Sequence, residues 1–348
     1  MIFALLLAAA TAATVQPPAH PAPRPPIPVT PENFPRAESD LHFAALVKEG
    51  GLGKFVHRRD PVALDHQGMT RMNRDTLYSA AVFDLDAGPV TITLPDAGKR
   101  FLSMQIVDED ANTAKVVYGP GPTTLTKVAI GSRYALAAVR IFVDASGPKD
   151  VEAVRALQNA VKVDEPGGPG AFVVPNWDAT SQVDVRTGLM VLADTLPDAK
   201  GLAGPRGGGD PVRRLIGAGA AWGGLPQTDA QFVNVVPDRN DGRTVYRLTL
   251  KDVPVDGFWS VSVYDADGRF AANPQKAYSV NSVTAAAGPD GAVVVQFGGC
   301  DGPVANCIPT PPDWSYIVRL YRPRADLLSG AWTLPAAQPA APGPVPER

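Results

Sequence analysis

The sequence predicts a mainly β protein made of two β-sandwich or jelly-roll-like domains, with a few helices at the N-terminus and in the connector between the domains. Short segments with apolar residues at every second position favour strands, and 36 prolines with 33 glycines supply frequent turns. An internal repeat predicts that the two domains are related. A chain of 348 residues is long enough for about two domains of ordinary size.

The composition is that of a globular protein rather than a disordered one. Hydrophobic residues make up 45% and charged residues 19% of the chain. The net charge is −3, and no long run of one sign occurs. Nucleic-acid binding needs a concentrated cationic surface, and attraction to an anionic membrane needs a polybasic segment, so we expect neither partner.

The first residues predict an exported protein. Met1–Ala13 is apolar and ends in small residues, as a signal peptide does, although no Lys or Arg precedes it. This run is too short to span a bilayer, which takes about 20 residues, and no later stretch is long and apolar enough. Residues 14–29 are Pro-rich and predict an extended leader. We therefore expect a periplasmic or secreted protein without a transmembrane segment.

The first predicted domain, residues 30–165, begins with a helix and continues mainly as strands. Thr30 and Pro31 are typical of a helix start, but Pro35 breaks this part, so we predict the regular helix from Arg36 to Glu49. An apolar stripe at helical spacing predicts a second helix over Asp150–Val163. Period-two patterning predicts strands over Leu77–Leu85, Val90–Leu94, Arg100–Val107, Val116–Tyr118 and Tyr134–Val143.

Two segments far apart in the chain share one pattern. Residues 100–110 (RFLSMQIVDED) and 257–267 (GFWSVSVYDAD) place Phe, Ser and two Asp at the same spacing: Phe101, Ser103, Asp108 and Asp110 against Phe258, Ser260, Asp265 and Asp267. Further on, residues 139–142 (VRIF) correspond to residues 318–321 (VRLY). Strand–turn–strand units can converge on such patterns, but the recurrence in the same order favours two related halves.

A Gly- and Pro-rich connector, residues 166–229, separates the first domain from the second. The second domain is predicted over residues 230–335, and a Pro/Ala-rich tail follows at residues 336–348. The connector is long enough to line a cleft between the domains, and we predict one helix around Val183–Leu196. Its loop Gly204–Asp210 follows no strand and opens no obvious helix, so we do not expect a phosphate-binding loop.

Cys300 and Cys307 are the two cysteines of the chain. In an oxidising compartment they predict one local disulfide that closes a short loop. Two cysteines cannot form a structural zinc site without histidines, and none lies near them.

Several motifs resemble those of a pair of bacterial families. Residues 71–79 (RMNRDTLYS) resemble the signature of a domain of unknown function, number twelve-fifty-four. Residues 257–265 (GFWSVSVYD) resemble its usual C-terminal partner, number twelve-fourteen, and the similarity continues through residues 297–300, residues 319–323 and Trp332. The resemblance covers nearly everything from Asn33 to Pro335. It implies a sandwich-like N-terminal domain and a jelly-roll-like C-terminal domain, and it implies no mechanism.

The densest polar cluster of the chain lies within the first of these motifs. Arg71, Asn73, Arg74, Asp75 and Tyr78 could hold a carboxylate, a phosphate or a sugar, because Arg binds planar oxyanions through two hydrogen bonds. The alternative is a buried Arg–Asp network that fixes a loop against the sandwich.

Two tryptophans extend this candidate ligand site. Trp259 lies beside Phe258 in a strand, so one of the two faces the core and the other faces outward, where it could stack on a flat ligand. Trp177 lies in the connector and is our preferred candidate for the wall of a cleft. Core packing is the alternative for each tryptophan.

Metal and hydrolase chemistry have weaker support. The carboxylates Asp84, Asp86, Asp108, Glu109 and Asp110 lack the loop spacing of a calcium site and suit β-turns. No His follows His66, so the second domain cannot carry a site of two His and one carboxylate. The sequence contains no Gly-x-Ser-x-Gly elbow. We predict no metal and no cofactor.

We therefore expect a protein that binds a small polar or glycan-like ligand in a cleft between two β domains. The first alternative is a metal-free ester or glycoside hydrolase that uses Asp75 or Asp108 as acid or base, or Ser79 with His66. The second is a structural envelope protein without a small-molecule site. Two titratable groups at one pocket would favour the hydrolase, and a buried, fully hydrogen-bonded cluster would favour the structural protein.

Overall fold

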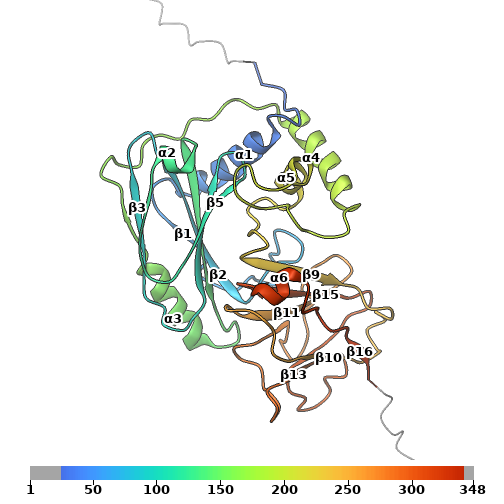
Figure 1. Ribbon diagram of the computed structural model, residues 1–348. Helices are drawn as coiled ribbons and strands as arrows, with labels where there is room; N and C mark the ends of the chain where they lie inside the picture. Colours follow the sequence, from blue (N-terminus) through green and yellow to red (C-terminus); the bar gives the residue numbers. More distant parts are fainter. Residues whose placement is uncertain (1–24, 341–348) are drawn as a thin grey trace, which may run out of the picture.

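The computed structural model describes residues 25–340, and the predicted signal peptide, the first part of the leader and the last residues of the tail lie outside this range. The protein is mainly β, as predicted, with its strands in four sheets. The predicted domain boundaries stay predictions, and we describe the chain as an N-terminal and a C-terminal half. In Figure 1 the strands of the N-terminal half run vertically, and the C-terminal half lies below and to the right.

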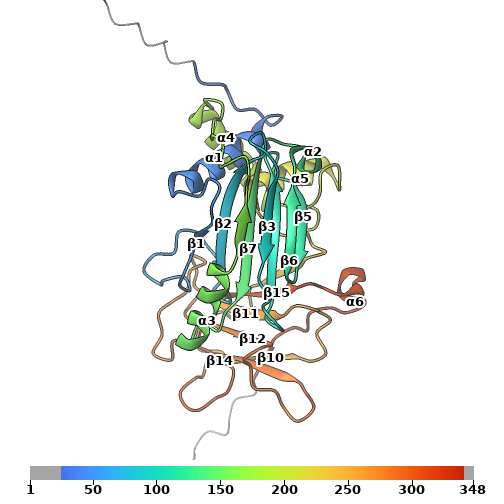
Figure 2. The same ribbon diagram turned by 90° about the vertical axis from the view of Figure 1, so that its left-hand side faces the viewer.

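The N-terminal half is a sandwich of two antiparallel sheets. Five strands in the order β1-β2-β7-β4-β5 pack against three in the order β6-β3-β8 (Figure 2). Aliphatic side chains of alternate residues fill the space between the sheets, because successive residues of a strand face opposite sides. The strands are β1 (Val56–His57), β2 (Thr76–Asp84), β3 (Val90–Leu94), β4 (Leu102–Asp108), β5 (Thr113–Tyr118), β6 (Gly121–Leu125), β7 (Tyr134–Phe142) and β8 (Lys162–Asp164).

The C-terminal half has two four-stranded sheets, in the orders β12-β11-β15-β9 and β14-β13-β10-β16. Its core contains Trp259, Phe297, Trp314 and Tyr316 among aliphatic residues. The strands are β9 (Ala230–Val235), β10 (Tyr246–Leu250), β11 (Trp259–Tyr264), β12 (Ser279–Asn281), β13 (Val293–Phe297), β14 (Cys307–Ile308), β15 (Ser315–Tyr321) and β16 (Gln338–Pro339). The predicted Cys300–Cys307 disulfide is present in this half.

Helices α1 (Phe34–Lys48), α4 (Ala179–Ala193) and α5 (Pro211–Ala220) form a layer over one end of the five-stranded sheet, opposite the C-terminal half (Figure 1). Helix α3 (Pro148–Asn159) adds Val151 and Val154 to the core of the N-terminal half. Helices α2 (Lys127–Ile130) and α6 (Ala325–Ser329) are single turns.

The helix predicted around Val183–Leu196 is α4, which begins and ends a few residues earlier. Three further differences from the prediction have a physical reason. Helix α1 begins at Phe34 rather than Arg36, because Pro35 lies in the first turn, where its missing N–H costs no hydrogen bond. The chain after α3 does not stay helical to Val163, because residues 162–164 join the smaller sheet as β8. The expectation that Gly204–Asp210 opens no helix is wrong: Asp210 caps α5 through the backbone N–H groups of Val212 and Arg213.

The two halves correspond strand for strand. The chain order β2, β3, β4, β5, β6, β7 of the first half matches β9, β10, β11, β12, β13, β15 of the second, and the matching strands have the same neighbours. The registers also agree: β7 pairs Arg140 with Ser103 of β4, and β15 pairs Arg319 with Ser260 of β11. The repeated sequence pattern therefore marks equivalent pairs of strands.

The repeated aspartates close equivalent turns. Asp108 Oδ1 accepts from the backbone N–H groups of Asp110 (2.9 Å) and Asn112 (2.9 Å). Asp265 Oδ1 accepts from those of Asp267 (3.0 Å) and Arg269 (2.8 Å). These hydrogen bonds support the interpretation of the Asp residues as turn formers.

The halves meet through an aromatic cluster that the repeat itself supplies. Phe101 and Phe142 of the first half pack with Phe258 and Tyr321 of the second, with ring centroids 4.4 to 5.2 Å apart. Equivalent ends of the two repeats thus contact each other, and the residues around them form the boundary between the halves.

Candidate functional site

The predicted polar cluster lies at this boundary, and Asn73 is one of its buried residues. Its Nδ2 donates to Thr76 Oγ1 (3.0 Å) and to the phenol oxygen of Tyr321 (2.9 Å) in the other half. Its Oδ1 accepts from the backbone N–H of Asp75 (2.9 Å). Asn73 therefore fixes the entry to β2 and ties it to the C-terminal half.

Asp75 is buried and also reaches across the boundary. Its Oδ1 accepts from Ser279 Oγ (3.0 Å) and Asn281 Nδ2 (3.2 Å), both on β12. Burial raises the pKa of Asp75, and the nearby charge of Arg319 and the hydrogen bonds from β12 only partly oppose this effect. Asp75 therefore connects the halves and is held away from solvent.

The two arginines of the motif do not surround Asp75. Arg71 is exposed and contributes its backbone carbonyl, which accepts from Arg319 Nη2 (2.8 Å). Arg74 donates to the carbonyl of Val62, and its Cζ lies 5.1 Å from the ring centre of Tyr278. Neither guanidinium forms an ion pair with Asp75 within the described residues. The two guanidinium groups thus have different surroundings, and their role in holding a ligand stays a prediction.

Two equivalent rows of side chains cross the larger sheets at the boundary. In the first half, register places Tyr78, Arg140, Ser103 and Tyr118 side by side on β2, β7, β4 and β5. In the second half, Phe232, Arg319, Ser260 and Asn281 occupy the same positions on β9, β15, β11 and β12. Each arginine lies over the aromatic ring of its row, at 5.6 Å in the first and 5.9 Å in the second.

The two arginines differ in how fully they are hydrogen-bonded. Arg319 is buried and donates to Ser262 Oγ, to the phenol oxygen of Tyr264 and to the carbonyls of Arg71 and Met72, at 2.6 to 3.2 Å. Arg140 donates from Nη2 to the carbonyl of Gly223 (3.1 Å), whereas its buried Nη1 has no partner among residues 25–340. The arginine of the second row is thus the better satisfied of the two.

Other buried polar atoms beside Arg140 are also without partners. Ser103 lies directly opposite Arg140 on β4, and Gln105 is two residues further on the same face. Both side chains are fully buried, yet Ser103 Oγ and Gln105 Oε1 have no hydrogen-bond partner in the described part of the chain. Gln105 Nε2 donates to Gly224 (2.8 Å), so the Gly223–Gly224 segment covers this part of the sheet. We call Tyr78, Ser103, Gln105 and Arg140 the open row.

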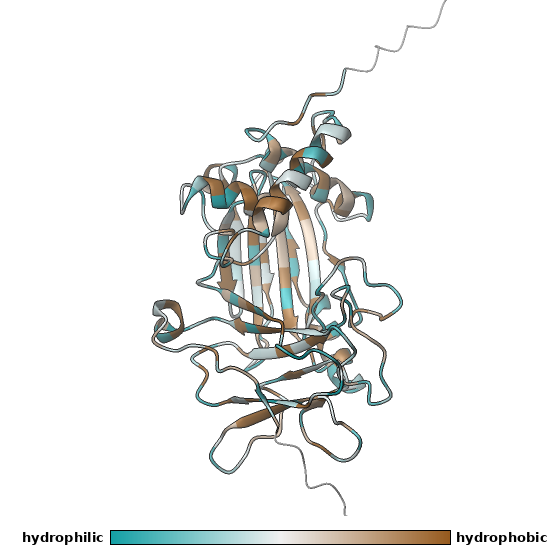
Figure 3. Ribbon diagram, turned by 90° about the vertical axis from the view of Figure 1, so that its right-hand side faces the viewer, coloured by the Kyte–Doolittle hydropathy of each residue, from teal (hydrophilic) through white to brown (hydrophobic). Residues whose placement is uncertain are grey.

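Tyr78 brings an aromatic ring and a phenol to the open row. The residue is partly exposed, and its phenol oxygen lies 3.4 Å from Asn73 Nδ2. Burial of the phenol favours the neutral form, but the charge of Arg140 and hydrogen bonds with Thr76 and Asn73 outweigh it, so the pKa of Tyr78 is lowered. In Figure 3 this face of the sheet lies between the helices and the C-terminal half and shows hydrophilic positions among hydrophobic ones.

The two predicted tryptophans lie elsewhere. Trp259 faces the core of the C-terminal half, as the equivalent Leu102 does in the first half, while its neighbour Phe258 packs at the boundary. Trp177 packs within the helical layer and donates from Nε1 to Asp40 Oδ2 (2.8 Å). Neither tryptophan lies in the polar cluster: Trp259 is a core residue, the alternative given for it, and the role of Trp177 stays a prediction.

The residues considered for hydrolysis are not assembled into a catalytic group. Ser79 is buried, and its Oγ lies 2.8 Å from Nδ1 of His57. His66, the predicted partner of Ser79, is exposed and lies beside Asp65 instead. Asp108 is buried, bonded to its own turn and paired with Arg206 at 2.8 Å. The pair Ser79–His66 is therefore not formed, and the Asp108 carboxylate is occupied by structural contacts.

The sequence contained a signal for the residues that were missed. Arg140 and Ser103 belong to the repeated pattern, as do Arg319 and Ser260, and a repeat that places Arg opposite Ser twice indicates a polar row at the contact between the halves. Gln105 carries no such signal, because its equivalent in the second half is a serine, two residues beyond Ser260.

Comparisons with known proteins support the predicted resemblance. Residues 52–130 match the family model described as a protein of unknown function (DUF1254), and residues 234–325 match that of a second protein of unknown function (DUF1214). The two matches follow the predicted N-terminal and C-terminal order. No curated protein matches.

Two solved structures show similarity to this chain. The VPA0106 protein from Vibrio parahaemolyticus is 17% identical, with a TM-score of 0.70 over 88% of this chain and 96% of that one. An uncharacterised protein from Burkholderia cenocepacia is 14% identical, with a TM-score of 0.45 over 84% of this chain and 85% of that one. The first similarity confirms the fold.

Residues 25–340 include no helix long and apolar enough to cross a membrane. In the same part of the chain, no group of three or more His, Cys, Asp or Glu side chains is arranged to hold a metal ion.

Proposed function

We propose that this protein is exported and binds a small polar, glycan-like ligand at the open row between its halves. The single observation that carries the proposal is a set of three neighbouring buried atoms without partners in residues 25–340: Arg140 Nη1, Ser103 Oγ and Gln105 Oε1. A buried polar group without a hydrogen bond costs about 1–3 kcal/mol, so three together on one sheet face require an explanation.

The chemistry of the three atoms indicates the kind of ligand. Arg140 Nη1 is a charged donor, Gln105 Oε1 is an acceptor, and Ser103 Oγ can be either. A ligand that satisfies all three presents a donor and an acceptor close together, as the neighbouring hydroxyl groups of a sugar or hydroxy acid do. Tyr78 is partly exposed, and in this proposal its ring offers such a ligand an apolar face.

The arginine of the second row supports this proposal by contrast. Arg319 occupies the position equivalent to Arg140 and has four hydrogen bonds, as expected of a structural contact. The contrast is confined to the arginines, because Ser260 Oγ and Asp75 Oδ2 also have no partner among residues 25–340. In our proposal the second row and Asp75 hold the halves together, and the open row binds. The disulfide in the C-terminal half is consistent with an exported protein.

The test is a thermal-shift screen of the oxidised protein from residue 14 onward against sugars, hydroxy acids, organic acids and phosphates. The variants are Arg140→Met, which keeps much of the side-chain length and removes the donors, and Lys115→Ala, which removes one exposed positive charge from neighbouring β5. We expect a sugar or hydroxy acid to raise the midpoint of the wild type and of Lys115→Ala, but not of folded Arg140→Met.

The contrary result is equally definite. If no compound shifts the wild type, or if the shift persists in folded Arg140→Met, the open row is a structural contact and the binding proposal fails.

A further inference from the structure

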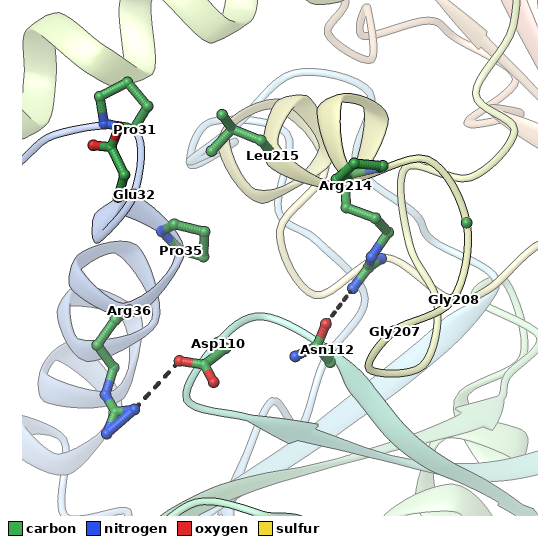
Figure 4. Close-up of a pocket in the computed structure, with 12 residues that line it drawn as sticks. Pro31, Glu32, Pro35, Arg36, Asp110, Asn112, Gly207, Gly208, Arg214 and Leu215 are labelled. Atoms are coloured by element: carbon green, nitrogen blue, oxygen red, sulfur yellow. Dashed lines mark hydrogen bonds and ion pairs between the residues drawn. The ribbon is translucent and has the colours of Figure 1, made fainter.

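A separate cavity lies at the far end of β4 from the boundary. It has a volume of about 710 Å³ and lies between the start of α1, the turn after β4 and the loop that leads into α5 (Figure 4). Its apolar walls include Pro31, Pro35 and Leu215, and its charged walls include Glu32, Arg36, Asp110 and Arg214. The volume is within the range of sites for small organic ligands.

The charges on the α1 side of the cavity are mostly compensated. Arg36 lies 3.1 Å from Glu109 and 3.3 Å from Asp110. Asp110 is also paired with Arg206 at 3.0 Å. Glu32 is exposed to solvent. This side therefore leaves no buried charge that requires a ligand.

Arg214, on the opposite side, is bonded to neutral groups. Its guanidinium donates to the carbonyls of Leu202 (3.1 Å) and Ala111 (3.3 Å) and to Asn112 Oδ1 (2.9 Å). It forms no ion pair with any residue between 25 and 340. Burial lowers the pKa of Arg214, and the charge of Asp108 only partly opposes this effect. These three bonds leave part of the five-donor guanidinium available.

The backbone beside Arg214 leaves room for a ligand. Gly207 and Gly209 adopt positive φ angles of 69° and 80°, and a Cβ at either would meet no atom within 4 Å. The first turn of α5 is not the source of binding donors, because Asp210 already accepts from two of its N–H groups. The guanidinium is thus the group that a ligand would meet.

We propose that this cavity binds a small organic oxyanion, a carboxylate or phosphate monoester, through the guanidinium of Arg214. The anionic group pairs with the positive charge of Arg214 and accepts a hydrogen bond from one of its remaining N–H donors. The organic part packs on Pro31, Pro35 and Leu215. This site is independent of the open row, since the two share no residue.

The experiment measures binding of the oxidised protein to inorganic phosphate, a sugar phosphate and an aliphatic dicarboxylate by calorimetry at low salt. The variants are Arg214→Gln and, as the matched control, Arg213→Gln. Arg213 precedes Arg214 on α5 but pairs with Asp198 at 2.8 Å, away from the cavity walls. We expect an organic oxyanion to bind more tightly than phosphate. Arg214→Gln should weaken the affinity for this oxyanion at least tenfold, and Arg213→Gln should change it less than threefold.

A variant at the rim keeps the test decisive if Arg214→Gln does not fold. Glu32 is exposed, so Glu32→Lys leaves the core intact, and it should tighten an oxyanion several-fold in a salt-dependent way. Arg140→Met should leave this binding unchanged, which separates it from the proposed function.

The inference is overturned if no oxyanion binds the wild type, or if binding is insensitive to Arg214→Gln. Weaker binding to Glu32→Lys would overturn it as well. Binding of inorganic phosphate alone, equal in all variants, would likewise exclude a site built around Arg214.

Discussion

Asp75 and Asp229 occupy equivalent positions in the two halves, and each accepts a hydrogen bond from the opposite half. Asp75 precedes Thr76, the first residue of β2, which pairs with Phe142. Asp229 precedes Ala230, the first residue of β9, which pairs with Tyr321. Asp75 accepts from Asn281 (3.2 Å), and Asp229 accepts from Tyr118 (3.0 Å), the residue equivalent to Asn281. The two halves therefore have the same strand order, and they also exchange equivalent hydrogen bonds.

The reciprocal contacts differ in burial, which predicts unequal losses of stability. Asp75→Ala leaves Ser279 and Asn281 without their acceptor in a buried position, so we expect the free energy of unfolding to fall by about 1–3 kcal/mol. Asp229 is partly exposed, and water can replace it, so Asp229→Ala should cost less than about 1 kcal/mol. Urea unfolding of both variants measures the difference, and equal losses would contradict this explanation.

The two arginines of the rows should also differ in their contribution to stability. Arg319→Met removes four hydrogen bonds of a buried guanidinium, and we expect a loss of about 3 kcal/mol or more. Arg140→Met removes the bond to Gly223 but also an unpaired buried donor, so its cost should stay within about 1 kcal/mol. Chemical denaturation decides the comparison, and a larger loss for Arg140→Met would show that the open row is structural.

Asp40 predicts a pH dependence of stability. Burial, together with Glu109 and Asp110, raises its pKa from 3.8 to about 6, against the opposing hydrogen bond from Trp177 and the charge of Arg36. Because the folded state binds the proton more tightly than the unfolded state, this residue's contribution to stability falls as pH rises from about 4 to about 6. The change for Asp40 is about 2–3 kcal/mol.

Asp40→Asn should remove that fall, since the amide stays neutral and its oxygen can still accept from Trp177. Urea unfolding at pH 4 and pH 6.5 compares the variant with the wild type, and Asp198→Asn, at an exposed ion pair, is the control. Parallel pH curves for Asp40→Asn and the wild type would refute the role of Asp40.

Reduction of the disulfide should destabilise the protein moderately. Cys300 and Cys307 close a short loop next to β13, so the chain-entropy model gives a stabilisation of about 2 kcal/mol. The double variant Cys300→Ser with Cys307→Ser should show this loss without any reductant, and dithiothreitol should then have no further effect. A midpoint in the wild type that does not change on reduction would contradict the prediction.

Sequence patterns predicted the fold well where one face of a strand is buried. The alternation of Val90–Leu94 predicted that strand with its observed bounds, and the repeat indicated the correspondence of β4 with β11. Helix α5 was missed because its start is marked only by the capping pair Asp210-Pro211, which directly follows a glycine-rich loop. The sequence of its own strand does not show whether Trp259 faces the core, since the neighbouring Phe258 is equally apolar. The equivalent residue Leu102 faces the core of the first half, and Trp259 faces that of the second in the same way.

The candidate sites were less predictable than the fold. Asn73, Asp75 and Tyr78 were identified as a polar cluster. The partners of Asn73 on β15 and of Asp75 on β12 are 248 and 204 residues away in sequence, however, and spacing cannot show such pairs. The cavity beside Arg214 is formed by residues near positions 31, 110 and 214, and no sequence pattern links these three segments. Arg319 has four hydrogen bonds, whereas Nη1 of its equivalent Arg140 has no partner in the described part of the chain. This difference depends on side-chain geometry, and no sequence pattern indicates it.

The contacts between the repeated strands have a practical consequence for the peptide chain itself. Phe101, Phe142, Phe258 and Tyr321 join the halves directly, and the hydrogen bonds of Asp75 and Asp229 lie beside them. None of these contacts depends on an intact backbone at the largely exposed loop of residues 207–209. A molecule cleaved in that loop should therefore stay assembled, and two separately produced fragments should complement each other to rebuild it.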